Sequence, residues 1–297
     1  MPVLGHTQYG KAEVRVVRLF RDTDPHGIAD HNVSVALSGD FADTHLSGDN
    51  SRVLTTDAIK NTVNAFAKEH GDAARTPEMF GLVLARHFTE LPQVARARVN
   101  LETYPWRRLD AGGVPHPHAF ARDGSHVRTT TVTRTADDAE WVVSGIRGLT
   151  VLKTTDSEFH GFLTERYTTL APTDDRVMAT EVTAQWWHGT LPDDPDAAHV
   201  AVLDALTSAF AGHHSLALQQ TLFAMGSAAL TAVPGIGEIR LSLPNKHHFL
   251  VDLSPFGLDN PGEVFHADDR PYGLIEATVR RDDTPDPGDA FDPGQGW

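Results

Sequence analysis

The fold is set by the stretch Glu13-Val14-Arg15-Val16-Val17-Arg18-Leu19, in which Val14 and Val16 alternate with charged side chains. Such alternation is typical of a strand with one buried face. A second strand is predicted over Asn32-Val33-Ser34-Val35-Ala36-Leu37. Two strands in direct succession favour an antiparallel pair, because parallel strands need a long crossover between them.

Two helices are predicted next. Ile59, Val63 and Phe66 form an apolar stripe at helical spacing, and the Thr and Asp residues before it place the start of this helix near Thr56. Thr76-Pro77-Glu78 indicates a second helix start, with Thr as the cap and Pro in the first turn. The chain therefore passes from paired strands to paired helices.

The remaining elements repeat this order. We predict strands over residues 95–101, 127–133, 141–146, 177–182, 239–243 and 274–279, and two further helices with the stripes Leu203/Leu206/Phe210 and Leu218/Leu222/Met225. Strands joined to strands, with helices grouped in pairs, predict the α+β class, an antiparallel sheet with helices on one face.

The repeated order predicts two tandem units, residues 1–136 and 137–281. Sequence identity between the halves is not evident, so the repeat is one of element order. Residues 282–297 are rich in Pro, Asp and Gly, and this composition predicts a disordered acidic tail.

Composition excludes several classes of function. The 297 residues include 25 Lys and Arg against 40 Asp and Glu, a formal net charge of −15. An acidic surface repels phosphate backbones, so we expect no nucleic-acid partner. Cysteine is absent, which excludes disulfides, thiolate metal sites and cysteine nucleophiles. No apolar run is long enough to span a bilayer and the N-terminus lacks a leader pattern, so we expect no membrane partner and a cytoplasmic location.

Histidine is frequent, with 17 residues, and it clusters at His116-Pro117-His118, His213-His214 and His247-His248. Neighbouring residues on a strand point to opposite faces, so a doublet in extended chain does not easily supply two ligands to one ion. No known metal-binding or phosphate-binding loop is present. We therefore predict no metal site, with solvated loop histidines as the ordinary interpretation and a histidine-rich ion-binding protein as an alternative.

Polar residues just outside regular elements are the other candidates for function. Pro244 interrupts the strand pattern after Leu243, so Asn245 and His247 are predicted to lie in a loop. Lys11 stands immediately ahead of the first predicted strand. Taken alone, these features describe a capped loop and a surface charge.

Taken together, ten short segments resemble the urate oxidase (uricase) family. They are Gln8–Arg15 (QYGKAEVR), Gly48–Asn50, Thr56–Asp57, Lys60–Thr62, His116–His118, Gly148–Lys153 (GLTVLK), Tyr167–Leu170, Asp175–Arg176, Ser242–His247 (SLPNKH) and Pro271–Ile275. Each segment is weak alone, but in this order they cover the chain from about Gln8 to about Arg281 and are highly specific.

The resemblance implies the tunnelling fold (T-fold), with two tandem units that each combine an antiparallel sheet with two helices. It implies a homotetramer in which the active sites are shared between subunits. It also implies the reaction, in which urate, O2 and water give 5-hydroxyisourate and H2O2 with neither a metal nor an organic cofactor.

The same resemblance implies a substrate site. Arg176 and Gln219 look like the pair that grips the polar edge of the purine, and Phe159 looks like the aromatic platform under its ring. A guanidinium fork suits a planar anion, and a carboxamide offers both a donor and an acceptor. Leu218 resembles the apolar residue beside the purine, and Asn245 lies where O2 or the attacking water binds. Without the resemblance, Arg176 would be interpreted as a surface ion pair with Asp175 and Phe159 as ordinary core.

Lys11, Thr56 and His247 resemble the family's proton relay. Urate must lose a further proton before it is electron-rich enough to reduce O2, and a Thr hydroxyl needs a neighbouring Lys to accept its proton. Thr56 and Asp57 begin a predicted helix, so their exposed N–H groups favour an anionic ligand. In the family, these two residues and Lys11 come from the neighbouring subunit. The competing interpretation is another purine or pterin enzyme of the same fold, but such relatives carry Glu where this chain has Gln219.

Overall fold

The computed structural model describes residues 1–292 and divides into two compact units. Of the described residues, the first unit contains Met1–Gly145, Trp186–Asp196 and 285–292, and the second contains Ile146–Gln185 and Ala197–Thr284. The division after Gly145 falls within the long strand β7 (Glu140–Lys153), nine residues beyond the expected one at 136, which lies in the turn before that strand.

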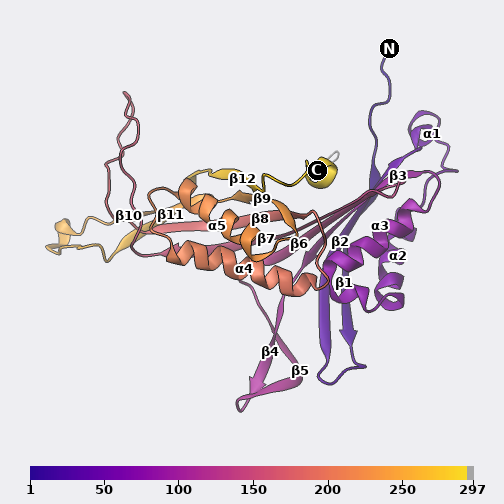
Figure 1. Cartoon of the computed structure of the whole chain (residues 1–297), viewed down its shortest axis with the longest axis horizontal. Helices are drawn as coiled ribbons and strands as arrows, with labels where there is room; N and C mark the ends of the chain where they lie inside the picture. The colour runs from indigo at the N-terminus through magenta and orange to yellow at the C-terminus, as the bar shows by residue number, and fades with distance from the viewer. Residues whose placement is uncertain (293–297) are drawn as a thin grey trace. The chain divides into compact units, whose positions relative to one another are not determined.

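The first unit combines a sheet with two main helices (Figure 1). Its strands are β1 (Tyr9–Phe20), β2 (Gly27–Gly39), β3 (Val94–Thr103), β6 (Val127–Thr135) and the start of β7 (Glu140–Lys153), neighbours in that order. Its helices are α1 (Ala42–Leu46), α2 (Thr56–Glu69) and α3 (Pro77–Thr89), with 3-10 turns η1 (Ala73–Arg75) and η3 (Gly288–Phe291). A separate antiparallel hairpin is formed by β4 (Trp106–Ala111) and β5 (Val114–Arg122).

The core of the first unit follows from the alternating pattern of its strands. Val33 and Val35 on β2 are buried, and Val35 pairs with Val99 on antiparallel β3. Their buried face packs in one cluster with Ile59 of α2 and Phe80 of α3. Residues of one strand that point to one face thereby meet the apolar stripe of each helix.

The second unit holds the rest of the sheet and the second pair of helices (Figure 1). Its strands are the end of β7, most of β8 (Met178–His188), β9 (Ile236–Ser242), β10 (Asn245–Leu250), β11 (Phe265–Gly273) and β12 (Glu276–Arg280). β8 is a neighbour of β10 and of β9, β10 pairs with β11, and β9 pairs with β12. Its helices are α4 (Pro195–Gly212), which begins at the boundary, and α5 (Leu218–Ala232), with the 3-10 turn η2 (Ser254–Phe256).

In each unit, one helix approaches the sheet so closely that only glycine fits. A Cβ on Gly81 of α3 would lie 2.6 Å from Val132 Cγ2, and a Cβ on Gly226 of α5 would lie 2.6 Å from Val279 Cγ2. Interiors at native density leave no room for such a methyl group. The two units therefore use the same packing device at their helix–sheet interfaces.

The predicted helix starts are confirmed, since α2 begins at Thr56 and α3 begins at Pro77 after Thr76. The hairpin β4–β5 and the paired strands β10 and β11 were not expected. The hairpin β4–β5 lacks an apolar alternation because most of its side chains are exposed. Residues 245–250 form β10 where a loop was expected, because only Leu243 and Pro244 separate it from β9 and Asn245 then pairs with Thr180 of β8.

The end of the chain also differs from the expected disordered tail. Ala290, in η3, is buried against Val143 and Trp187, and Asp292 forms an ion pair with Arg96 at 2.6 Å. The composition of the tail is polar, but Ala290 and the partly buried Phe291 pack this turn against the cluster. The last expected tail residues, 293–297, lie outside the described residues.

Candidate active site

Lys11 lies on β1 immediately before a β-bulge, where the pairing register with β2 shifts. Glu13 in the bulge has a φ of 57°, in the left-handed region, and its N–H donates to Ser34 Oγ at 3.0 Å. Gly10 permits a close approach of the two strands, because a Cβ there would lie 1.8 Å from Val35 O. Bulges change the direction of side chains beside functional sites.

Lys11 also lines a hollow of about 610 Å³ on the first unit. Tyr9, Glu13, Arg98 and Asn100 contribute to the same wall. The hollow thus collects acidic, basic and amide side chains around the Lys11 ammonium group.

Thr56 and Asp57 occupy the first turn of α2. The cap is Thr55, whose hydroxyl accepts a hydrogen bond from Ala58 N–H at 3.1 Å. Lys60 Nζ lies 2.6 Å from the Asp57 carboxylate, and this contact lowers the pKa of Asp57, with a weaker contribution from Lys11. Lys11 is therefore within electrostatic reach of the helix start.

A tyrosine connects the strand of Lys11 with the turn before α2. Tyr9 Oη accepts a hydrogen bond from Leu54 N–H at 2.9 Å, and burial raises the pKa of the Tyr9 phenol. The Tyr9 ring also packs edge-on against Phe41, with 4.8 Å between centroids. The structure thereby links the segments that carry Lys11 and Thr56.

In the second unit, Phe159 and Arg176 lie together. Arg176 Cζ stands 5.5 Å from the centroid of the Phe159 ring, a cation–π distance. The two segments are joined by a pair of backbone hydrogen bonds, from Phe159 N–H to Thr173 O at 2.8 Å and from Thr173 N–H to Phe159 O at 3.0 Å. A second aromatic ring, Phe162, stacks on Phe159 at 5.1 Å.

The Arg176 guanidinium is half-buried, and this burial lowers its pKa. Its Nε donor has no hydrogen-bond partner within the described residues. The neighbouring Asp175 carboxylate instead accepts from Thr155 Oγ1 at 2.7 Å and Ser157 N–H at 3.5 Å, and within residues 1–292 no ion pair joins it to Arg176. A half-buried guanidinium with an open donor is suited to an anionic, planar ligand.

Leu218 and Gln219 form the first turn of α5, with Leu218 buried and Gln219 exposed. The cap residue, Ala217, offers no side-chain acceptor to this turn. The positive end of the helix dipole therefore lies at Gln219 without a carboxylate in the first turn to compensate it.

Asn245 and His247 lie on β10. Asn245 pairs with Thr180 of β8, two residues after the start of that strand at Met178, and Arg176 lies just before the same start. His247 pairs with Asp268 of β11 and stacks on Phe249 at 5.7 Å. Arg176 and Asn245 are thus both near the start of β8. Arg176 is near it in the sequence, and Asn245 is near it through strand pairing.

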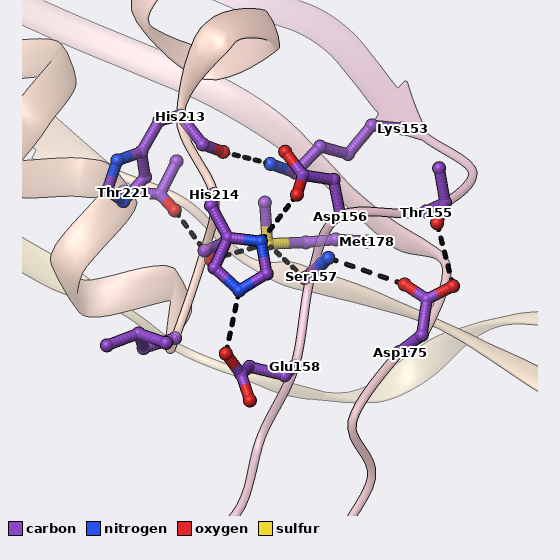
Figure 2. A network of polar contacts seen from close by, with 12 residues as sticks. Lys153, Thr155, Asp156, Ser157, Glu158, Asp175, Met178, His213, His214 and Thr221 are labelled. Atoms are coloured by element: carbon purple, nitrogen blue, oxygen red, sulfur yellow. Dashed lines mark hydrogen bonds and ion pairs between the residues drawn. The ribbon is translucent and has the colours of Figure 1, made fainter.

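A polar network holds the segments around Phe159 (Figure 2). His214 contacts Asp156 through Nδ1 and Glu158 through Nε2, the latter at 2.7 Å, while Lys153 Nζ donates to the carbonyl of His213. Sequence reasoning treated His213-His214 as a solvated loop and missed this role, because the partners lie 56 and 58 residues away along the chain.

Two groups of predicted residues are thus present, Lys11, Thr56 and Asp57 in the first unit and the remaining six in the second. Among the described residues, the one group with metal-like geometry is Glu158, His160 and Asp174, whose ligand atoms lie within 4.8 Å of one another. None of the three histidine clusters seen in the sequence belongs to it. Glu158 already accepts hydrogen bonds from both His160 and His214.

Along residues 1–292, no helix combines the length and the apolar character that crossing a membrane requires. The two units, each with an antiparallel sheet and a pair of helices, define an α+β protein of the tandem tunnelling fold. Residues 7–133 and 142–276 match the family model described as Uricase. The chain belongs to the uricase family.

Individual relatives support the same assignment. The chain is 52% identical to the uricase of Arthrobacter globiformis over 281 residues, which cover 94% of this chain and 90% of that protein. The crystal structure of uricase from Arthrobacter globiformis superposes with a TM-score of 0.91 at 50% identity, covering 96% of this chain and 97% of that one. The uricase of Aspergillus flavus is 37% identical over 297 residues, covering 95% and 98%.

Proposed function

We infer that this member of the uricase family is a urate oxidase, which oxidises urate with O2 and water to 5-hydroxyisourate and H2O2. The observation that carries the inference at the site is the half-buried Arg176 guanidinium, which lies 5.5 Å from the Phe159 ring and keeps an open Nε donor. Urate is a planar anion, so it can accept from the guanidinium while its ring lies against an aromatic side chain.

We propose that Arg176 and Gln219 bind the polar edge of urate, with Phe159 under its ring and Leu218 beside it. Gln219 would meet the purine at the start of α5, where the helix dipole adds to the attraction for an anion. Asn245 would stand beside the pocket for O2 or water. The placement of Asn245 on the strand paired with β8 supports this role, since Arg176 precedes the same strand.

The proton relay of the proposal consists of Lys11, Thr56 and His247. Lys11 accepts the proton of the Thr56 hydroxyl, so that Thr56 can take a proton from urate. The dianion that results transfers two electrons to O2, which becomes H2O2 with two protons, and water adds to the oxidised ring to give 5-hydroxyisourate. His247 orients that water and passes protons, because an imidazole has one nitrogen that can donate and one that can accept. Urate itself supplies the electrons, so the proposal needs no metal or organic cofactor.

We further propose a homotetramer with active sites shared between subunits, in which Lys11, Thr56 and Asp57 of one subunit meet the second-unit residues of another. The first and last strands in the sheet order, β1 and β11, each have one edge without a neighbour among the described strands. Such edges can pair with another chain. Mixing inactive Thr56→Ala subunits with inactive Arg176→Ala subunits would restore activity if sites are shared, and proven mixed tetramers without recovery would contradict sharing. The cytoplasmic location remains a prediction.

The central test follows urate absorbance and O2 uptake together, using the full chain after exhaustive chelation. We expect urate and dissolved O2 to be consumed at equal molar rates, with H2O2 formed in the same amount. Activity that returns only when iron, copper or flavin is added would contradict the cofactor-free reaction.

A further inference from the structure

Phe159 follows an irregular segment, residues 154–158, which lies outside the helices and strands. Backbone bonds tie this segment to residues 213–215, since Glu158 N–H donates to Ser215 O at 2.8 Å and Ser215 N–H donates to Asp156 O at 3.1 Å. The second segment leads directly into α5, which begins at Leu218. The first of these hydrogen-bonded segments therefore leads to Phe159, and the second leads to Gln219 in the first turn of α5.

His214 closes this joint from the solvent side. Its ring stands between two carboxylates of the irregular segment, with Nδ1 toward Asp156 and Nε2 2.7 Å from Glu158 Oε1 (Figure 2). Beneath it, Ser157 and Ser215 are fully buried, and Ser215 Oγ accepts from Thr221 Oγ1 of α5 at 2.7 Å. The exposed layer is thus ionic, and the buried layer consists of hydroxyls and the Met178 sulfur.

The bridge requires a protonated ring. An imidazolium donates through both nitrogens, whereas a neutral imidazole donates through one and presents a lone pair at the other. Since ionised carboxylates only accept, a neutral His214 would satisfy one carboxylate and repel the other. The hydrogen bonds to Asp156 and Glu158 accordingly raise the pKa of His214 and lower the pKa values of both carboxyl groups.

Other charges face this bridge. His160 contacts the second oxygen of Glu158, and Lys153 and Asp175 act on Asp156 electrostatically. Lys153 is already engaged by the backbone carbonyl of His213, and Asp175 by Thr155. Among the described residues, His214 is thus the group that contacts both carboxylates at once.

We propose that protonated His214 is a positioning residue for urate, which holds the Phe159 platform and the start of α5 in the arrangement that binds the purine. This inference rests on the proposed function and extends it. His214 touches no reacting atom, so it acts on the affinity for urate and leaves the chemical step unchanged. Its contribution is present while the ring is charged and is lost as the pH rises through the raised pKa.

The test compares His214→Gln with the matched control His160→Gln, which removes a contact to Glu158 without breaking a bridge. Binding of urate is measured without O2, so that no turnover occurs, and kcat is measured separately with O2. We expect His214→Gln to raise the dissociation constant about 2–5-fold, as exposed ionic contacts do, with kcat within about twofold and the melting temperature within a few degrees. His160→Gln should stay close to the parent protein.

A second variant, His214→Arg, keeps a positive charge at every accessible pH. In the parent, the dissociation constant for urate should rise between neutral and mildly alkaline pH, and in His214→Arg this part of the rise should disappear. Lys11 and His247 are common to both proteins, so any contribution they make to the pH dependence cancels in the comparison. An unchanged affinity in His214→Gln, an equal effect of His160→Gln, or the same alkaline rise in His214→Arg would overturn the proposal. If Arg176→Ala also left urate binding unchanged, the proposed substrate site itself would be at fault.

Discussion

His188 in the first unit and His214 in the second each join polar side chains from distant parts of the chain. His188 is 6% exposed, and burial lowers its pKa to about 4. The His214 side chain is 52% exposed, and hydrogen bonds to Asp156 and then Glu158 raise its pKa. At neutral pH the first ring is therefore neutral and the second is shifted toward its charged form.

The partners explain the difference. His188 Nε2 lies 2.8 Å from Ser144 Oγ, which donates to Glu78 at 2.6 Å, while Arg128 pairs with the other oxygen of Glu78 at 2.7 Å. Glu78 is fully buried, so Arg128 already neutralises it and repels a second cation on His188. His214 instead contacts two carboxylates at the surface, and both raise its pKa.

The two units otherwise share a packing plan, as Gly81 and Gly226 show at their helix–sheet contacts. The same scaffold thus supports a buried network that acts on stability and a solvent-facing network that acts on ligand binding. We extend this contrast to function, because the proposed relay takes Lys11 and Thr56 from the first unit and only His247 from the second, whereas Arg176, Gln219 and Phe159, proposed to bind the purine, all lie in the second unit.

Substitutions in the proposed relay should have the largest effect of the variants that test this contrast. Lys11→Met or Thr56→Ala should lower turnover by about 10²–10⁴, because general-base catalysis acts in the transition state. Binding of urate without O2 should weaken only modestly. Thr62→Ala is a matched control on α2, since the Thr62 hydroxyl donates to Ala58 O at 2.9 Å within the helix. Unchanged steady-state turnover in both relay variants would refute the relay.

Next in size is the buried network of the first unit. Glu78→Gln should lower the free energy of unfolding by about 3–5 kcal/mol, because it leaves Arg128 without its buried counter-charge. The control Asp40→Asn breaks the exposed pair with Arg52, at 2.7 Å, and should cost less than about 1 kcal/mol. Denaturant unfolding measures both, and equal losses would contradict the role assigned to burial.

The opposite pKa directions predict opposite pH effects. The unfolded chain binds a proton at His188 below its ordinary pKa of 6.5, whereas the folded chain resists until about pH 4. Acidification over this window should therefore remove up to about 3 kcal/mol of stability. In His188→Gln this dependence of unfolding free energy on pH should become shallower. An unchanged slope would show that His188 does not titrate as its burial implies.

The smallest effect in this series concerns affinity in the second unit. Arg176→Ala should raise the dissociation constant for urate about 10–100-fold, the usual loss for charged hydrogen bonds. Arg166→Ala serves as the control, since Arg166 is exposed and stacks near Tyr167 at 5.2 Å. Calorimetric titration without O2 would measure both, and an unaltered value for Arg176→Ala would exclude it from the purine site.

Much of the fold could be predicted because its helices carry strong local signals. Pro77 after a Thr cap marked α3, and the stripe of Ile59 and Val63 marked α2. The hairpin β4–β5 and the strand β10 escaped, since their residues are held by pairing and not by an apolar face. Hydrophobic periodicity indicates which face of an element is buried, so it does not detect a strand that is held only by hydrogen-bonded pairing.

The candidate site was accessible from the sequence only in part. Thr56 could be placed at a helix start from its neighbours, but the roles of Phe159 and Arg176 came from a resemblance to a family. The bridge through His214 could not be predicted, because it depends on two turns that meet across more than 50 residues. A short-range sequence pattern contains no information on a contact between residues so far apart in the chain.

The hydrogen bond from Leu54 N–H to Tyr9 Oη has a dynamic consequence. Because it ties the edge strand to the turn ahead of α2, we expect thermal motion of the sheet edge to move Lys11 and Thr56 together. A gap across which a proton must hop depends steeply on relative displacement and hardly at all on shared displacement. One phenol oxygen can thereby damp the motion that would matter most to the hop.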